Sequence, residues 1–292
     1  MSMHVFGAVL TGRGTAANNR GVTDGNITTL QKLIWNGQVH STISAEAIRF
    51  ALRRRFQEDG HECNRSFDEN TRENAWKDPT FAGWLEGKGK GTRFIDDDVL
   101  GFMAAEAAKE ERGKGSVTVR RAVLEITRAV SMTPWPGDVT FNAASPGATP
   151  SAQKKGSNPV PYGTEMHATK YQYGFALTPA RLTEPSRACV ALRALCALGP
   201  VAGNHGRFLF DFSPESVVFR ITEEAAPRIL YGFSSDEKSD GLPSILRKVE
   251  AGDIQPTELI VGGAVGEQFA QGATSALRGA EIFGVVPNSV EI

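Results

Sequence analysis

The chain has 292 residues, of which 40% are hydrophobic and 22% are charged, and its formal net charge is −1. This composition is typical of a globular protein with a sizeable core, and it excludes a global positive field that would draw the whole molecule to nucleic acid or to an anionic membrane. Three widely spaced cysteines favour a reducing cytoplasm over a disulfide framework, and no stretch reaches the roughly 18 consecutive apolar residues of a membrane span.

The first part of the chain predicts a strand, a polar loop and a helix. An apolar run over 4–10 is typical of a strand, and residues 11–26 form a polar, glycine-rich loop. A helix is predicted over 45–56 from its apolar periodicity. The polar stretch 58–90 is irregular, and a second helix is predicted over 97–111.

The rest of the chain predicts strands and helices on either side of one long proline-rich segment. That segment covers 133–166 and returns into a strong strand at 168–177, so it is an excursion from a domain rather than a domain boundary. An apolar helix over 185–198 is followed by a glycine-containing loop at 199–207. The other predicted elements are a strand or hairpin at 117–132, strands at 208–212, 217–221 and 258–261, and helices at 243–251 and 267–277.

The order of these elements predicts the fold class. Without insertions, the order is strand, helix, strand, strand, helix, strand, which is the order of ferredoxin-like and RNA-recognition (RRM) folds. We therefore predict an α+β protein with a single RRM-like domain over 1–292. Its insertions fall at 57–116 and 133–166, and residues 223–292 elaborate the C-terminal end.

The start of the first helix is a candidate site for phosphate. Ser44 suits the N-cap, because its hydroxyl can accept hydrogen bonds from the free backbone N–H groups that follow, at Ala45 and Glu46 and beyond. Arg49 and Arg53 lie four residues apart on one face of this helix. A helix start attracts anions, so the cap and the two arginines together predict a seat for a polyphosphate partner.

Three motifs occur in a fixed order along the chain. They are Asn-Asn-Arg at 18–20, the stretch from Ile43 to Arg53 that enters the helix, and Gly-Asn-His-Gly-Arg-Phe at 203–208. This combination resembles the Cas-seven backbone subunit of type I CRISPR effector complexes (Cascade), in the DevR branch of type I-B-like systems. The resemblance extends from Met3 to about Arg228.

The resemblance implies a hand-shaped RNA-binding protein without enzymatic activity or cofactor. An RRM-like palm would carry a helical finger region at 57–116 and a thumb at 133–166. Copies would stack head to tail along one CRISPR RNA, together with other Cascade subunits, and present the guide for pairing with target DNA, whose sequence is read by base pairing. Such a ribonucleoprotein serves antiviral defence in the cytoplasm.

The resemblance also implies where the RNA is held. Gly203 and Gly206 would let the backbone approach RNA closely, and Tyr162, Met166 and His167 are candidates to wedge against a base. The predicted RNA contacts are Arg13, Asn18, Asn19, Arg20, Asn26, Ser44, Ala45, Glu46, Arg49, Arg53, Lys154, Met166, His167, Gly203, Asn204, His205 and Arg207.

Plainer interpretations remain open for these segments. The helix over 45–56 could be only a capped amphipathic helix, and the loop at 199–207 could be an ordinary turn. The acidic run Asp96, Asp97, Asp98 is better explained as a helix cap than as a metal site, because adjacent side chains diverge. The five histidines show no ligand spacing, so no metal site is predicted.

Two other functions are alternatives to the scaffold. RNA-cutting relatives carry an aspartate near the position of Asn26, and Asp24 lies two residues before it, so a metal-dependent RNA endonuclease acting through Asp24 is one alternative. An amide at that position cannot serve as a carboxylate base, which favours a non-catalytic protein. A stand-alone RNA-binding regulator is the other alternative.

Overall fold

A computed structural model describes residues 2–18, 22–68, 70–71, 73–85, 91–106, 116–145, 160–234, 241–271 and 281–282. The largest sheet within these ranges consists of β1 (His4–Thr11), β5 (Lys32–Trp35), β6 (Gln38–Ile43), β11 (Leu124–Ile126), β12 (Ala129–Ser131), β15 (Tyr171–Leu177), β16 (Pro214–Thr222), β17 (Leu259–Gly263) and β18 (Glu281–Ile282). Its order is β18-β17-β16-β1-β15-β12-β6-β5, and β11 also pairs with β15. The prediction of a mixed α and β protein is confirmed.

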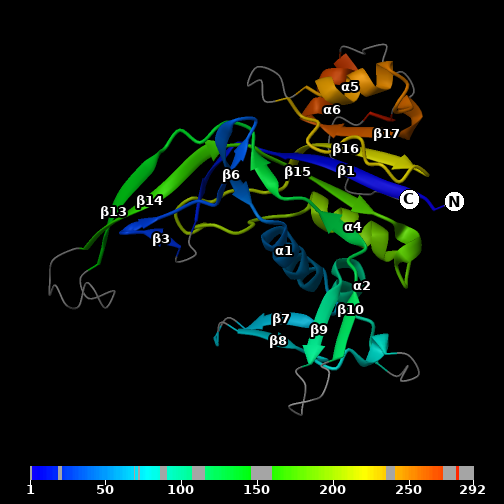
Figure 1. Cartoon of the computed structure of the whole chain (residues 1–292), viewed down its shortest axis with the longest axis horizontal. Coiled ribbons are helices and arrows are strands. Elements are labelled where there is room, and N and C mark those ends of the chain that lie inside the picture. The colour runs from blue at the N-terminus through cyan, green and yellow to red at the C-terminus, as the bar shows by residue number, and fades with distance from the viewer. Residues whose placement is uncertain are drawn as a thin grey trace.

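Helices cover both faces of this sheet (Figure 1). On one face lie α1 (Ala45–Glu58) and α4 (Arg187–Cys196), and on the other lie α5 (Pro243–Glu250) and α6 (Ala264–Gln271). The central strand β1 is buried on both sides, because Val5 and Val9 belong to the core under α1 and α4 whereas Phe6, Ala8 and Leu10 belong to the core under α5. The sheet thus separates two hydrophobic cores, one under α1 and α4 and the other under α5 and α6.

A long hairpin extends from the sheet to one side (Figure 1). It pairs β13 (Val139–Ala144) with β14 (Val160–Thr169), and β14 also pairs with β2 (Gly14–Ala17) and with β4 (Ile27–Thr28), which itself pairs with β3 (Thr23–Asp24). The prediction of a loop at 11–26 was therefore wrong, and the described parts of the excursion at 133–166 contain β13 and the first part of β14. β2 and β4 pair with β14 across more than a hundred residues of sequence, and these short segments lack the alternation that marks a strand locally.

Two further hairpins and a short helix lie below α1 in the same view. They are β7 (Arg65–Asp68) with β8 (Glu73–Trp76), β9 (Phe102–Glu106) with β10 (Ser116–Arg120), and α2 (Ile95–Leu100), preceded by a single 3₁₀ turn at Ala82–Trp84. The predicted helix over 97–111 is wrong from residue 101 onward as far as the structure describes it. Gly101 has a φ of 67° and lies against the backbone of Arg120, so the chain turns there into β9.

The three aspartates of α2 do not cap the helix. The N-cap position is Phe94, without a side-chain hydrogen bond, and the carboxylates in the first turn are buried. Asp96 accepts from the backbone N–H of Asn64 at 2.7 Å, and Asp98 pairs with Arg187 at 2.8 Å and with Arg120. The acidic run therefore ties the hairpins below α1 to α4 instead of serving as a cap.

Several other predictions can be compared with the structure. Residues 208–212 form no strand, whereas the helix at 243–251 and the strands at 217–221 and 258–261 are confirmed within a few residues. The last helix, α6, begins at Ala264 rather than at 267. No helix among the described residues is both long and apolar enough to cross a membrane.

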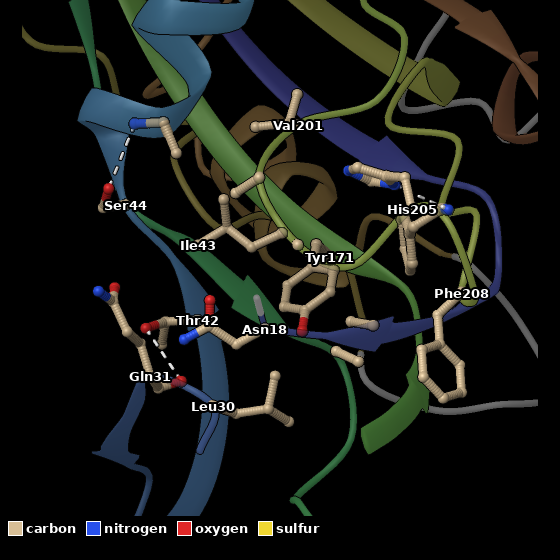
Figure 2. A pocket seen from close by; sticks show the side chains of 16 residues that line it. Asn18, Leu30, Gln31, Thr42, Ile43, Ser44, Tyr171, Val201, His205 and Phe208 are labelled. Atoms are coloured by element: carbon tan, nitrogen blue, oxygen red, sulfur yellow. Dashed lines mark hydrogen bonds between the residues drawn. The ribbon is translucent and has the colours of Figure 1, made fainter. Parts of the chain in front are cut away.

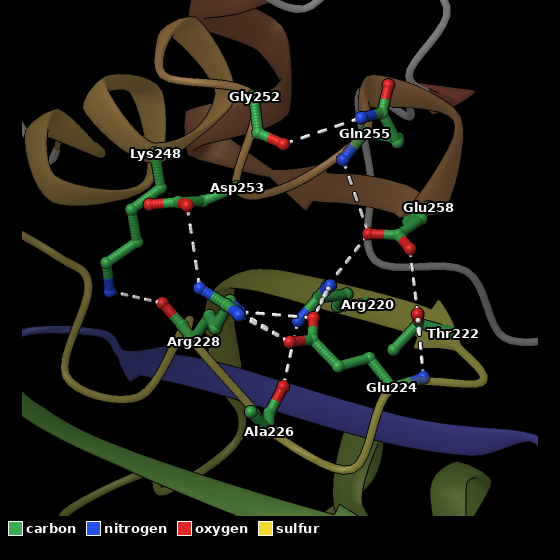
Figure 3. Close-up of polar contacts among 10 residues, drawn as sticks. All are labelled: Arg220, Thr222, Glu224, Ala226, Arg228, Lys248, Gly252, Asp253, Gln255 and Glu258. Carbon is green, nitrogen blue, oxygen red and sulfur yellow. Dashed lines mark hydrogen bonds and ion pairs between the residues drawn. The ribbon is translucent and has the colours of Figure 1, made fainter.

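An ion-pair network centred on one buried arginine joins the C-terminal segment to the sheet (Figure 3). Arg220 of β16 is only 1% exposed, and it pairs with Glu258 at 2.9 Å and with Glu224 at 2.6 Å. Glu258 also accepts from the hydroxyl of Thr222 at 2.7 Å. Hydrogen bonds from Arg228 and Arg220 lower the pKa of Glu224 to about 2, so this carboxylate stays ionised.

Candidate nucleic-acid interface

Segments that are far apart in the sequence meet at one pocket beside the start of α1 (Figure 2). The pocket has a cavity volume of about 50 Å³ and opens partly to solvent. Four predicted RNA contacts line it, namely Asn18 after β2, Ser44 before α1, and Gly203 and His205 in the loop after α4. Each of the three sequence motifs therefore contributes to the same cavity.

The start of α1 is built as the sequence predicts. Ser44 has an extended backbone, and its hydroxyl oxygen accepts from the N–H of Ala47 at 3.2 Å, which confirms the N-cap. Glu46 is exposed, and hydrogen bonds to its carboxylate from its own backbone N–H and from Ser44 lower its pKa. The helix start thus already faces an anionic side chain, with which a phosphate would compete.

Both arginines of α1 have partners within the protein. Arg49 donates to the carbonyl oxygen of Leu100 at the end of α2, and burial lowers its pKa. Arg53 lies 3.5 Å from Asp96, and its side chain is 13% exposed. The structure therefore directs these two guanidinium groups toward α2, and a phosphate contact would have to use their remaining donors.

The loop after α4 packs against the end of β2. The N–H of Asn204 donates to the carbonyl of Ala17 at 2.9 Å, and Gly203 has a φ of +91°. A Cβ at Gly203 would lie 2.8 Å from that same carbonyl oxygen, whereas a Cβ at Gly206 would meet nothing closer than 3.9 Å. Glycine at 203 is thus required by contact between two protein segments, and only Gly206 leaves its backbone open to an outside partner.

The exposed side of this loop carries Arg207. Its guanidinium lies 5.2 Å from the centre of the Tyr162 ring on β14. His205 has a different role, because the N–H of Phe210 donates to its Nδ1 at 3.3 Å. Arg207 is therefore the cation that this loop presents at its junction with the long hairpin.

His167 cannot serve as the predicted wedge. It is 1% exposed, its Nδ1 lies 2.7 Å from the Ser41 hydroxyl, and its Nε2 lies 3.2 Å from the Thr133 hydroxyl. Burial lowers its pKa to about 4, so the ring stays neutral at physiological pH. Met166, next to it, is half-buried, and its carbonyl accepts from the Trp135 indole at 3.0 Å.

The other predicted contacts are dispersed. Asn18 donates to the carbonyl of Thr29 at 2.8 Å, which fixes it at the pocket, whereas Asn26 is exposed in the turn between β3 and β4. Arg13 precedes β2, and Ala45 is half-buried at the first position of α1. Asn19, Arg20 and Lys154 lie outside the described residues.

One candidate contact has no signature in the sequence. Arg128 is exposed between β11 and β12, and its Nη1 donates to the Gln31 side chain at 3.2 Å and to the Thr42 hydroxyl at 3.1 Å. Both partners line the pocket. Only the pairing of β12 with β6 brings this lone arginine to the site, so no local motif could have indicated it.

The described residues contain no group of three or more His, Cys, Asp or Glu side chains placed to hold a metal ion. The polar groups around the pocket are instead amides, hydroxyls, backbone N–H groups, the imidazole of His205 and two flanking arginines. Groups of these kinds position the sugar–phosphate backbone of nucleic acids.

Known proteins are similar to this chain in sequence or in fold. A protein of Myxococcus xanthus (strain DK1622), described as CRISPR-associated protein Cas7/Cst2/DevR, is 66% identical over 284 residues, which cover 97% of this chain and 93% of that protein. Two solved structures, described as a CRISPR RNA-guided surveillance complex and as such a complex before nicking, contain chains with TM-scores of 0.54 and 0.56 at 13% identity. These matches cover 98% of this chain and 95% and 97% of those chains.

The sequence profile of one family covers most of the chain. It is described as CRISPR-associated negative auto-regulator DevR/Csa2, and it matches residues 8–249. That span contains all three motifs around the pocket, and the 66% identity to the Myxococcus xanthus protein agrees with it. The chain belongs to the DevR/Csa2 family of CRISPR-associated proteins.

Proposed function

We propose that this protein is the non-catalytic backbone subunit of a type I CRISPR effector complex. It binds CRISPR RNA, assembles head to tail with further copies and with other Cascade subunits, and presents the guide for pairing with target DNA. The observation that carries the proposal is the meeting of three separate motifs at one pocket flanked by Arg128 and Arg207. Family membership and the likeness to chains of surveillance complexes support it.

The proposal assigns a part of the hand to each region. The RRM-like palm is formed by the adjacent strands β16-β1-β15-β12 with α1 and α4, which follow in the expected order along the chain. The insertion at 57–116 is the finger region, and that at 133–166 is the thumb. Residues 223–292 elaborate the single domain.

The phosphates lie over the junction of the loop after α4, the end of β2 and the start of α1. Arg128 and Arg207 are exposed cations beside this junction, and Gly206, without a side chain, lets a phosphate approach the backbone closely. Phe141 replaces His167 as the wedge against a base, because its ring is 75% exposed on β13 of the thumb hairpin. An exposed aromatic ring can stack on any base irrespective of sequence.

The test is the RNA that co-purifies with the protein. Changing Arg128 and Arg207 together to Glu should remove bound RNA of defined length, because two phosphate-neutralising charges are reversed. Arg193→Glu is the matched control, because Arg193 is also exposed but lines a different hollow near the C-terminal ends of α1 and α4. Full retention of RNA by the double variant, or equal loss in the control, would contradict the proposal.

A further inference from the structure

A second cleft lies between the β9–β10 hairpin and the short 3₁₀ turn Pro179–Arg181 that precedes α4. Its cavity volume is about 390 Å³, which is within the range of pockets that bind small ligands. Three arginines line it, and none of the other described residues in its lining is acidic. They are Arg120 and Arg121 at the end of β10 and Arg181 in the 3₁₀ turn. The cleft shares no lining residue with the pocket beside α1.

Contacts within the protein hold Arg120 in place at this cleft. Its Nη2 donates to the buried carboxylate of Asp98 and to the carbonyl oxygen of Arg181, the latter at 3.2 Å. Its guanidinium carbon lies 4.2 Å from the centre of the Trp84 ring. All its hydrogen bonds to described residues come from Nη2, so Nη1 keeps its donors. An anion would therefore meet a cation that is already ordered, which lowers the entropic cost of binding.

Arg181 is the cation of the cleft whose charge is not compensated. Its side chain is exposed, and it has neither a hydrogen bond nor an ion pair to any residue that the structure describes. Three acidic side chains near the cleft, by contrast, are each paired with another arginine, namely Asp98 with Arg120, Glu125 with Arg121, and Glu184 with Arg187. The cleft thus has positive charge in excess, and a bound anion would balance it.

The distribution of charge favours a compact anion over an extended strand. Glu125 lies four residues after Arg121, Glu184 lies three residues after Arg181, and both carboxylates reach solvent. A strand of phosphates that ran beyond the cleft would meet these carboxylates and be repelled. A small anion could remain beside the guanidinium groups, whose planar fork of donors matches the oxygens of a phosphate.

We propose that this cleft binds a small anion that carries phosphate groups, with Arg120 and Arg181 as its two main contacts. Arg120 supplies a fixed guanidinium, and Arg181 supplies one that is free to turn toward the ligand. The cleft is a second site, separate from the interface at the start of α1. The inference does not depend on the proposed RNA-binding function.

The experiment is a calorimetric titration of the full-length protein with inorganic pyrophosphate at constant ionic strength. Arg181→Gln removes one charge from the cleft and should not disturb the fold, because this side chain has no described partner. Arg247→Gln is the matched control, because it removes the same charge from an exposed arginine on α5, which covers the other face of the sheet (Figure 1). The titrations are repeated with a saturating oligouridylate, which occupies the proposed guide interface.

The wild type and Arg247→Gln should bind pyrophosphate with the same Kd, and one equivalent should still bind in the presence of oligouridylate. Arg181→Gln should bind about tenfold more weakly, as expected for the loss of one charge-assisted contact. Arg120→Gln should weaken binding at least as much, and Arg181→Gln decides the matter if that variant does not fold.

Three results would overturn the proposal. They are the absence of pyrophosphate binding by the wild type, an equal Kd for Arg181→Gln and Arg247→Gln, and displacement of pyrophosphate by oligouridylate or by duplex DNA. Displacement would show that the cleft belongs to a track for nucleic acid and not to a site for a small anion. Absent binding or an equal Kd would leave the RNA-binding function intact, because that function is tested separately by the co-purified RNA.

Discussion

Among single residues, the buried carboxyl of Asp97 makes the stability of the protein depend on pH. It is 2% exposed, and burial together with the charge of Asp96 raises its pKa from 3.8 to about 7. The folded state therefore holds this proton more tightly than the unfolded state does. The stability that Asp97 contributes is complete below pH 4 and is lost as the pH rises through 7.

Asp97→Asn should remove this loss, because an amide does not titrate. Relative to the variant, the wild type should lose on the order of 1–3 kcal/mol of unfolding free energy between about pH 5 and 8. Urea denaturation of both proteins at the two pH values measures it. The pKa of His167 is lowered to about 4, so this residue makes the folded state more stable as the pH rises from 4 to its ordinary value of 6.5. Both proteins contain His167, so its contribution cancels in the comparison. If the unfolding free energies of the two proteins changed equally with pH, Asp97 would not have a raised pKa in the folded state.

Among the elements, the loop after α4 owes its position to Gly203. Alanine there would combine a φ of +91° with a Cβ 2.8 Å from the Ala17 carbonyl, so Gly203→Ala should cost about 1–3 kcal/mol of unfolding free energy. Gly206→Ala, in the same loop, should change stability little, because a Cβ there meets only one atom, at 3.9 Å. Equal denaturant midpoints for the two variants would show that the loop does not pack on β2 in solution.

The elements that local signals specify were predictable, and those that depend on distant partners were not. Helix α1 follows from the cap at Ser44 and from apolar periodicity, both of which are local. The end of α2 depends on the contact of Gly101 with Arg120, which no helix pattern can indicate. The strands β2 and β4 pair with β14, which lies more than a hundred residues further along the chain.

The same distinction holds for the site. The three motifs supplied the candidate RNA contacts, and residues from each motif line one pocket. The sequence could not show that Arg53 faces Asp96, that His167 is buried, or that β12 brings Arg128 to the margin of the pocket. Burial and orientation depend on sheet order, which a single sequence does not contain.

For the molecule as a whole, the C-terminal segment is held by the buried arginine of β16. Arg220→Met should lower the unfolding free energy by about 1–3 kcal/mol, because the buried guanidinium no longer donates to the Glu258 carboxylate and to the Ala226 carbonyl. Arg228→Met should have a much smaller effect, since Arg228 is far more exposed. Thermal unfolding of the two variants measures the difference, and equal losses would argue against a buried anchor (Figure 3).

The position of the guide is tested by cross-linking the co-purified RNA to the protein with ultraviolet light and identifying the modified residues by mass spectrometry. Cross-links should concentrate at the pocket and its margin, on Phe208, on Tyr162 beneath Arg207, and on the segment that ends β2. Cross-links confined to the opposite face of the sheet, on α5 and α6, would show that the RNA lies elsewhere and would contradict the proposed function.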